Sequence, residues 1–170
     1  MKVEIGPYND DNESDFQRKI EVHIDDYDTW SMDHTLAYII VPMLKQLQAT
    51  KHGAPFVDDE DVPERLRSTN AKPKENEWDT DEFHFDRWDW ALDEMIWAFE
   101  QHNSDDDTSK FFDHSAADEA RAKAEETESD QDFNNYIRLI KVDREGLDAH
   151  EERKQHAFKL FGKYYTSLWD

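Results

Sequence analysis

The stretch from Glu77 to His102 constrains the fold of this chain more than any other part of it. Apolar side chains recur there at spacings of three and four, which predicts one apolar stripe along a helix. The stripe consists of Phe85, Trp88, Leu92, Met95, Ile96 and Phe99. Asp79 or Thr80 is the expected N-cap, and Glu82 completes an acidic capping box with Asp79. We therefore expect the central core helix here.

The remaining periodicities predict strands at one end of the chain and further helices. Residues 2–8 and 19–25 alternate and are expected to pair, and residues 136–142 are a third strand candidate. Further helices are expected at 33–53, with a kink or a late start at Pro42, and at 146–169. This order predicts an α+β fold, in which a small antiparallel sheet of two to three strands is covered by three main helices.

The length of the chain predicts one domain, residues 1–170. Within it, residues 54–77 form a long loop that contains three prolines and an acidic run. Four apolar side chains are expected to anchor this loop, namely Phe56, Val57, Val62 and Leu66. Residues 103–132 form the most polar segment, with no apolar face to dock it, so we expect either a solvated helix or mobility there.

The charge of the chain excludes some classes of partner. The 42 acidic and 20 basic residues leave a formal net charge of −22. Such a surface repels nucleic acid and anionic membranes and attracts cationic proteins or divalent metals. The absence of cysteine excludes disulfides and zinc–thiolate sites. No signal-peptide pattern and no membrane-length apolar run is present, which predicts a soluble cytosolic protein.

Four stretches of the sequence form a recognisable set, namely DYDTWSMDHTLA at 26–37, KHGAPFVDDEDVPE at 51–64, PKENEWDTD at 73–81 and LFGKYY at 160–165. Together they resemble a family of small acidic proteins encoded by tailed bacteriophages. The resemblance spans most of residues 19–100 and the last helix. The connection after Gly6-Pro7-Tyr8 is shorter than in the family pattern. The resemblance implies a phage origin, and hence the host cytoplasm or the virion as location, but it implies no mechanism.

Histidines and carboxylates suggest a weak candidate metal site at Asp33, His34, His84 and Asp86. Two histidines and a carboxylate can hold a divalent ion that activates water. However, His84 and Asp86 are two residues apart and cannot share a helix face, and the HExxH spacing is absent. Capping or surface roles are therefore the favoured interpretation, and no cofactor is expected, with a divalent metal as the minor alternative.

A calcium loop is a still weaker hypothesis. Asp10, Asn12, Ser14 and Glu21 fall at positions one, three, five and twelve of such a loop. The glycine required at position six is Asp15, and strands rather than helices are expected to flank the segment. These two departures disfavour a calcium site.

Acidic runs and tryptophans suggest a candidate binding surface. Its residues are Asp58, Asp59, Glu60, Asp61, Asp105, Asp106, Asp107, Trp78 and Trp90. Most tryptophans on a helix belong to the core, but Trp78, Trp90 or Trp30 can anchor a protein interface. The simplest interpretation of the carboxylates is a solvated face that maintains solubility. The alternative is imitation of B-DNA, which carries one negative charge per about 1.7 Å.

No catalytic signature accompanies these features, since the nucleophile elbow and the glycine-rich phosphate loop are both missing. We therefore favour a non-enzymatic phage accessory protein whose acidic surface engages a basic host protein. That partner would be a nucleic-acid-handling or defence factor, inhibited by a DNA mimic. One alternative is a virion or assembly component with an exposed aromatic patch. Another is a metal-dependent or nucleotide-handling enzyme. The sequence leaves the oligomeric state open.

Overall fold

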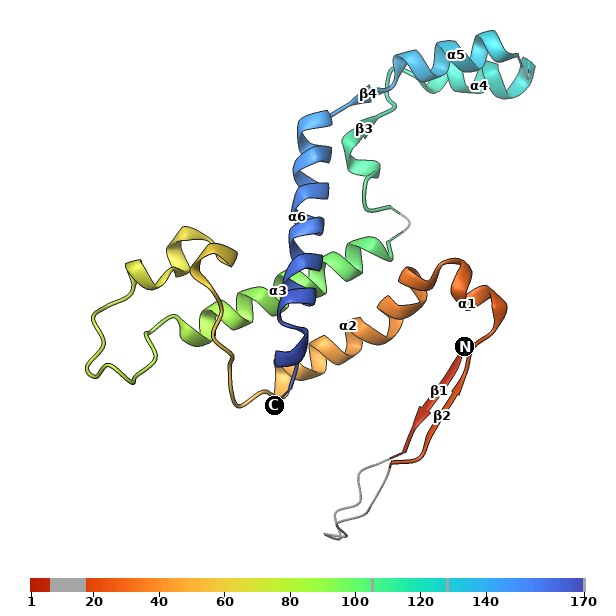
Figure 1. The fold of residues 1–170 in the computed structure, drawn as a ribbon. Coiled ribbons are helices and arrows are strands. Elements are labelled where there is room, and N and C mark those ends of the chain that lie inside the picture. Colours follow the sequence, from red (N-terminus) through yellow and green to blue (C-terminus); the bar gives the residue numbers. More distant parts are fainter. Residues whose placement is uncertain (7–17, 105, 128, 170) are drawn as a thin grey trace.

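Three helices form the body of the molecule. The computed structural model describes residues 1–6, 18–104, 106–127 and 129–169. Helix α3 (His84–His102) lies between α2 (Met32–Thr50) and α6 (Arg144–Lys163) and packs against both (Figure 1). A short helix, α1 (Asp26–Trp30), precedes α2. The Trp-rich segment is thus the central helix, as its periodicity predicts.

Helix α3 contributes more residues to the core than any other described element. Trp88, Leu92 and Met95 are almost completely buried, whereas Phe85 at the start of the stripe is about half exposed. The core residues that α2, α6 and the loop contribute are Ala37, Leu44, Val57, Val62, Ala157, Leu160 and Tyr164. The small side chains of Ala37, Ala91 and Ala157 are fully buried and allow close approach of the helices.

Helix α3 starts later than its capping signals predict, at His84 rather than after Asp79 or Thr80. The Asp79 carboxylate accepts hydrogen bonds from the backbone and side-chain nitrogens of Asn76, at 3.1 and 2.9 Å, and so closes a turn of its own. Asp81 accepts the backbone N–H of Phe83 at 2.9 Å and binds the Arg87 guanidinium. These bonds hold the preceding residues outside the helix.

Polar side chains fix the register between α2 and α3. Lys45 pairs with Glu100, Gln48 with Asp93 and Lys51 with Asp89. Residue numbers rise along α2 while they fall along α3, so the two helices are antiparallel. The start of α2 therefore lies beside the end of α3.

Arg153 makes the corresponding link between α6 and α3. It donates two hydrogen bonds to Glu94, at 2.8 and 2.7 Å. Its guanidinium also lies 3.8 Å from the centre of the Trp97 ring. One α6 side chain therefore holds both a carboxylate and an indole of the central helix.

Pro42 does not divide α2, nor does the helix start late because of it. The helix runs through Pro42, which is exposed, from Met32 to Thr50. A proline in mid-helix removes one backbone N–H donor. Ala37 and Leu44, on either side of it, are buried against the core. This packing offsets the lost hydrogen bond.

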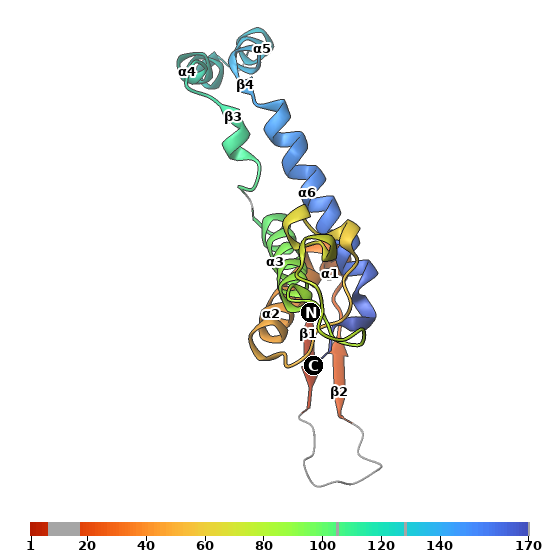
Figure 2. The ribbon, with the colours of Figure 1, turned by 90° about the vertical axis from the view of Figure 1, so that its left-hand side faces the viewer.

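Within the described residues the helices do not cover a sheet, which corrects the predicted arrangement. Strand β1 (Lys2–Ile5) pairs antiparallel with β2 (Ile20–His23), with Val3 opposite Val22 and Ile5 opposite Ile20. This hairpin projects from the body (Figures 1 and 2), and all eight strand residues are exposed. A second pair, β3 (Phe112–Asp113) and β4 (Lys141–Val142), is separate from it. The described fold is mixed helix and strand, with two small sheets.

The predicted third strand at 136–142 is mostly wrong, because a helix occupies its first part. Helix α5 (Asp130–Leu139) precedes β4, which retains two residues of the predicted strand. Phe133 and Ile137 are four residues apart on α5, and Ser129 caps its start by accepting the Gln131 backbone N–H. Together with α4 (Asp118–Thr127), α5 forms a helical hairpin beyond the far end of α6 (Figure 2).

The long loop wraps around the body through short 3-10 turns. These are η1 (Asp59–Asp61), η2 (Glu64–Leu66) and η3 (Ser68–Asn70), with η4 (Ser109–Phe111) and η5 (Tyr165–Ser167) elsewhere in the chain. Val57 and Val62 are buried as predicted, and Leu66 packs partly against the core. The prediction is wrong for Phe56, whose side chain is 80% exposed. Among the described residues, no helix is long and apolar enough to cross a membrane.

Candidate functional site

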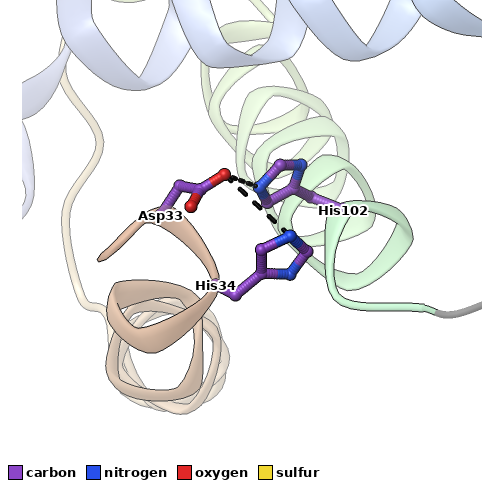
Figure 3. Close-up of side chains that lie close together, drawn as sticks. All are labelled: Asp33, His34 and His102. Atoms are coloured by element: carbon purple, nitrogen blue, oxygen red, sulfur yellow. Dashed lines mark hydrogen bonds and ion pairs between the residues drawn. The ribbon is translucent and has the colours of Figure 1, made fainter. Parts of the chain in front are cut away.

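Asp33, His34 and His102 converge where the start of α2 meets the end of α3 (Figure 3). His102 Nε2 lies 2.7 Å from Asp33 Oδ2, and His34 Nε2 lies 4.0 Å from the same oxygen. The two imidazole rings stack, with centroids 4.4 Å apart and planes inclined by 19°. Two histidines and a carboxylate therefore share one small site at the surface.

Neighbouring groups orient this site. Asn103, the residue after α3, places Oδ1 3.2 Å from His34 Nδ1. The pKa of Asp33 is lowered from its ordinary value, chiefly because His102 donates a hydrogen bond to the carboxylate. Asp33 is therefore ionised at neutral pH and presents a negative charge to both imidazoles.

The other two predicted metal ligands lie elsewhere. His84 is at the opposite end of α3, where it is buried against Phe56 and Phe85 and lies 3.1 Å from the Ala54 carbonyl oxygen. Asp86 is exposed near that same end. The structure thus brings together Asp33 and His34 but not His84 or Asp86.

His102 is absent from the predicted ligand set, although a signal for it exists in the sequence. Two long helices joined by a loop tend to pack antiparallel, which places the start of the first beside the end of the second. His102 is 69 residues from Asp33 and occupies that matching position. Local spacing alone does not reveal such a pair.

A second group of potential ligands, Asp107, His150 and Glu151, already holds a cation of the protein. Lys154 Nζ lies 2.8 Å from Asp107 and 2.7 Å from Glu151. Burial alone would raise the pKa of Asp107, but the hydrogen bond from Lys154 and the nearby His150 imidazole lower it overall. The ammonium group occupies the place a metal ion would need, so this cluster fits an internal ion pair.

The acidic run at 58–61 is largely engaged within the protein. Lys163 Nζ lies 2.7 Å from Asp58 and 2.6 Å from Asp61, and it also reaches Glu60. The hydrogen bonds that Lys163 donates to Asp58 and Asp61 raise the pKa of its ammonium group. Asp59 accepts hydrogen bonds from Ser68. These carboxylates fasten the loop to the end of α6.

Tyr164 strengthens the same attachment. Its hydroxyl donates to Asp61 and accepts the backbone N–H of Asp58 at 3.0 Å. Burial, together with the bond to Asp61, raises the pKa of Tyr164 to about 12. Tyr164 therefore remains a neutral donor at physiological pH.

The second acidic run divides between surface and interior. Asp106 is exposed, Asp107 is held by Lys154, and Asp105 lies outside the described residues. Three members of the calcium-loop hypothesis, Asp10, Asn12 and Ser14, also lie outside them. Glu21, its fourth member, is exposed on β2.

Exposed aromatic side chains stand beside carboxylates at two places. Trp78 is 83% exposed and lies between Glu77 and Asp79 in the chain. On α1, Tyr27 and Trp30 are 82% and 87% exposed, and Asp26 is one helical turn before Trp30. Trp90, in contrast, packs partly against the core, with its ring 6.2 Å from that of His156.

An apolar hollow of about 960 Å³ lies between α2 and the residues that follow α6. Ile40, Met43, Leu47, Phe161 and Leu168 contribute to its lining, and its few polar residues include Gln46, Thr50 and Tyr165. This lining contains no carboxylate and no histidine, and Tyr165 is its one titratable side chain among the described residues.

No family model, no curated protein and no solved structure matches this chain. Its function is therefore argued from the geometry of its own residues.

Proposed function

We propose that this chain is a phage-encoded accessory protein that binds a basic protein in the host cytoplasm. One observation carries the proposal: the exposed Tyr27, Trp30 and Trp78 stand beside carboxylates. An arginine or lysine side chain can stack on an aromatic face while it pairs with a neighbouring carboxylate. Tryptophan and tyrosine are also the residues that most often anchor protein interfaces.

The loop around Trp78 is suited to this role. The bonds between Asn76 and Asp79 fix its turn. Glu75 and Glu77 are exposed, and their carboxylates have no cationic partner within the described part of the chain. Lys74 instead donates to the Glu77 backbone oxygen at 3.1 Å. A partner's cation would thus meet two free carboxylates and an indole.

The charge of the molecule supports a basic partner. The cations that link the helices and the loop are already paired with carboxylates; they are Lys45, Lys51, Arg87, Arg153, Lys154 and Lys163. The field outside the protein is therefore dominated by unpaired carboxylates, which steer cations toward the surface. A host protein that handles nucleic acid, including a defence factor, presents the required basic surface, and this chain would compete for it as a DNA mimic.

The proposal is tested by capture of host proteins on the immobilised chain at about 50 mM and about 300 mM salt. The captured basic protein is then titrated with Trp30→Ala and Trp78→Ala variants. We expect weaker capture at the higher salt and at least about a tenfold loss of affinity for one of the variants, as for an interface hot spot.

Tyr38→Ala serves as the matched control, because Tyr38 is also exposed but has no carboxylate beside it in the chain. Capture that does not change with salt concentration would contradict the proposal. Equal losses of affinity for Tyr38→Ala and the two tryptophan variants would also contradict it.

The β1–β2 hairpin favours a second candidate function, that of a virion or assembly component. Val3, Ile5, Ile20 and Val22 form an apolar face that nothing in the described structure covers. An isolated two-stranded hairpin is marginally stable in water, so burial of this face in an assembly would stabilise it. The opposite face carries Glu4 and Glu21.

Light scattering and mass spectrometry of purified phage particles test this second function. We expect a defined oligomer that Val22→Ser disrupts and Glu21→Ser preserves. A monomer that is absent from particles would exclude it.

A further inference from the structure

We propose that Asp33, His34 and His102 bind one divalent transition-metal ion of the zinc type. The three residues come from two helices, and their ligand atoms all lie within 4.8 Å of one another. The inference is independent of the proposed binding function, because none of the three is among the aromatic residues Tyr27, Trp30 and Trp78 or the carboxylates next to them in the chain.

The position of the proton on His34 favours a cation between His34 and Asp33. We assign the His34 proton to Nδ1, because the facing Oδ1 of Asn103 can only accept. Nε2 of a neutral His34 then carries a lone pair 4.0 Å from the Asp33 carboxylate. Two acceptors that face each other repel unless a positive charge lies between them. A metal ion at that point would be bound by both, and Asn103 would hold the imidazole in the required orientation.

The distances allow coordination after small side-chain rotations. Zinc bonds to imidazole nitrogen and carboxylate oxygen are about 2.0–2.2 Å long, so neighbouring ligand atoms of a tetrahedral site are roughly 3.3 Å apart. The two observed distances to Asp33 Oδ2, 2.7 and 4.0 Å, lie on either side of this value. His102 and Asp33 would separate slightly, and His34 would approach.

The site is accessible to an ion and leaves room for further ligands. The side chains of Asp33, His34 and His102 are 61%, 49% and 25% exposed. Two imidazoles and one carboxylate leave at least one position of a tetrahedral ion to water. Imidazole nitrogen favours Zn²⁺, Co²⁺ and Ni²⁺ over Mg²⁺ and Ca²⁺, which prefer oxygen ligands. The net charge of −22 raises the cation concentration near the surface.

The alternative is a hydrogen-bonded clamp, in which Asp33 and His102 only tie the two helices together. A clamp requires Asp33 and His102 but not His34. Metal binding requires all three, and the proton on His102 Nε2 moves to Nδ1 of the same ring when Nε2 binds the ion. The contribution of His34 therefore separates the two cases.

The test is calorimetric titration of the untagged, EDTA-treated chain with Zn²⁺, because a histidine tag would bind the same ions. We expect one ion per chain. His34→Ala and His102→Gln should each weaken binding at least about tenfold, the loss seen on removal of metal-orienting groups. Co²⁺ should give visible absorption bands that both variants abolish.

His52→Ala is the matched control, because it removes an exposed histidine just beyond the other end of α2. It should retain full affinity. Far-UV circular dichroism confirms that the variants fold, and Asp33→Asn repeats the test with a side chain of the same shape. The absence of stoichiometric binding, undiminished binding in His34→Ala, or equal affinity for Mg²⁺ would each overturn the proposal.

Discussion

Arg87 is the residue on which the attachment of the long loop most depends. Its side chain is only 6% exposed. The guanidinium donates to Asp81 Oδ2 at 2.6 Å and to the Leu66 carbonyl oxygen at 3.0 Å. One cation thus joins the middle of the long loop, at Leu66, and the segment just before α3, at Asp81, to the first turn of that helix.

We predict that Arg87→Met lowers the free energy of unfolding by about 3–5 kcal/mol, because it leaves the Asp81 carboxylate in a largely buried position without its partner. Urea denaturation measures this change. Lys72→Met breaks the exposed pair with Glu82 nearby and should lower the free energy of unfolding far less than Arg87→Met does. Equal losses would show that burial does not determine the strength of the Arg87 pair.

Asp81 also predicts a pH dependence. The hydrogen bond from Arg87 lowers the pKa of its carboxyl in the folded state. The stabilisation is therefore present above the unfolded pKa of about 3.9 and is lost as pH falls through the folded value. Denaturation curves at about pH 5 and about pH 3 should show a smaller loss of stability for Asp81→Asn than for the natural chain. If Asp81→Asn and the natural chain lose the same stability between these two pH values, the acid sensitivity comes from other groups.

At the scale of elements, the α4–α5 hairpin is the part least tied to the rest. It packs internally and through His114 and Tyr136, while Phe133 and Ile137 remain exposed. Each helix has ten residues, and isolated helices of that length are marginal in water.

Hydrogen exchange should therefore distinguish this hairpin from the body. We predict that amides of residues 118–139 exchange on the order of tenfold or more faster than those of residues 88–99, because α3 is buried on both sides. Exchange followed by peptide mass spectrometry measures both segments in one sample. Equal protection would indicate that α4 and α5 unfold only with the whole molecule.

The elements that could be predicted from sequence are those with a long apolar stripe. Trp88, Leu92 and Met95 identify α3 as the core helix because their spacing has only one helical interpretation. The short apolar run at 136–142 fits a strand or a helix equally well. Phe133 lies four residues before Ile137, and this helical spacing distinguishes α5 from a strand. Whether helices cover a sheet depends on tertiary packing, which the alternation of Val3 and Ile5 does not encode.

The same distinction applies to the candidate site. Asp33 and His34 are adjacent, so their potential as ligands is visible in the sequence. His102 joins them only because α2 and α3 pack antiparallel. Likewise, nothing in the run at 58–61 indicates that Lys163, about a hundred residues later, pairs with it. Long-range pairing determines which charged residues remain available to a partner.

At the scale of the whole molecule, the excess of 22 negative charges opposes compaction. We predict that Tm rises when NaCl increases from about 10 mM to about 200 mM in the presence of EDTA, because salt screens repulsion between exposed carboxylates more than it weakens partly buried ion pairs. Differential scanning calorimetry measures the shift.

Asp148 and Glu152 provide the control for this prediction. Both are exposed, and they are four residues apart on α6, so the two charges repel. Glu152→Gln should raise Tm at low salt and reduce the response to NaCl. A Tm that falls with added salt would mean that attractive pairs outweigh repulsion.

The uneven burial of the indoles has an optical consequence. Trp88 is 1% exposed, whereas Trp30 and Trp78 are almost fully in water. The tryptophan fluorescence should therefore contain a blue component, emitted at shorter wavelength by Trp88, and a red component, emitted at longer wavelength by Trp30 and Trp78. The acidic surface repels iodide and attracts caesium, so only the cationic quencher should reach the red component efficiently. A ligand protein that covers Trp30 or Trp78 would shield the red emission from caesium and leave the blue emission unchanged.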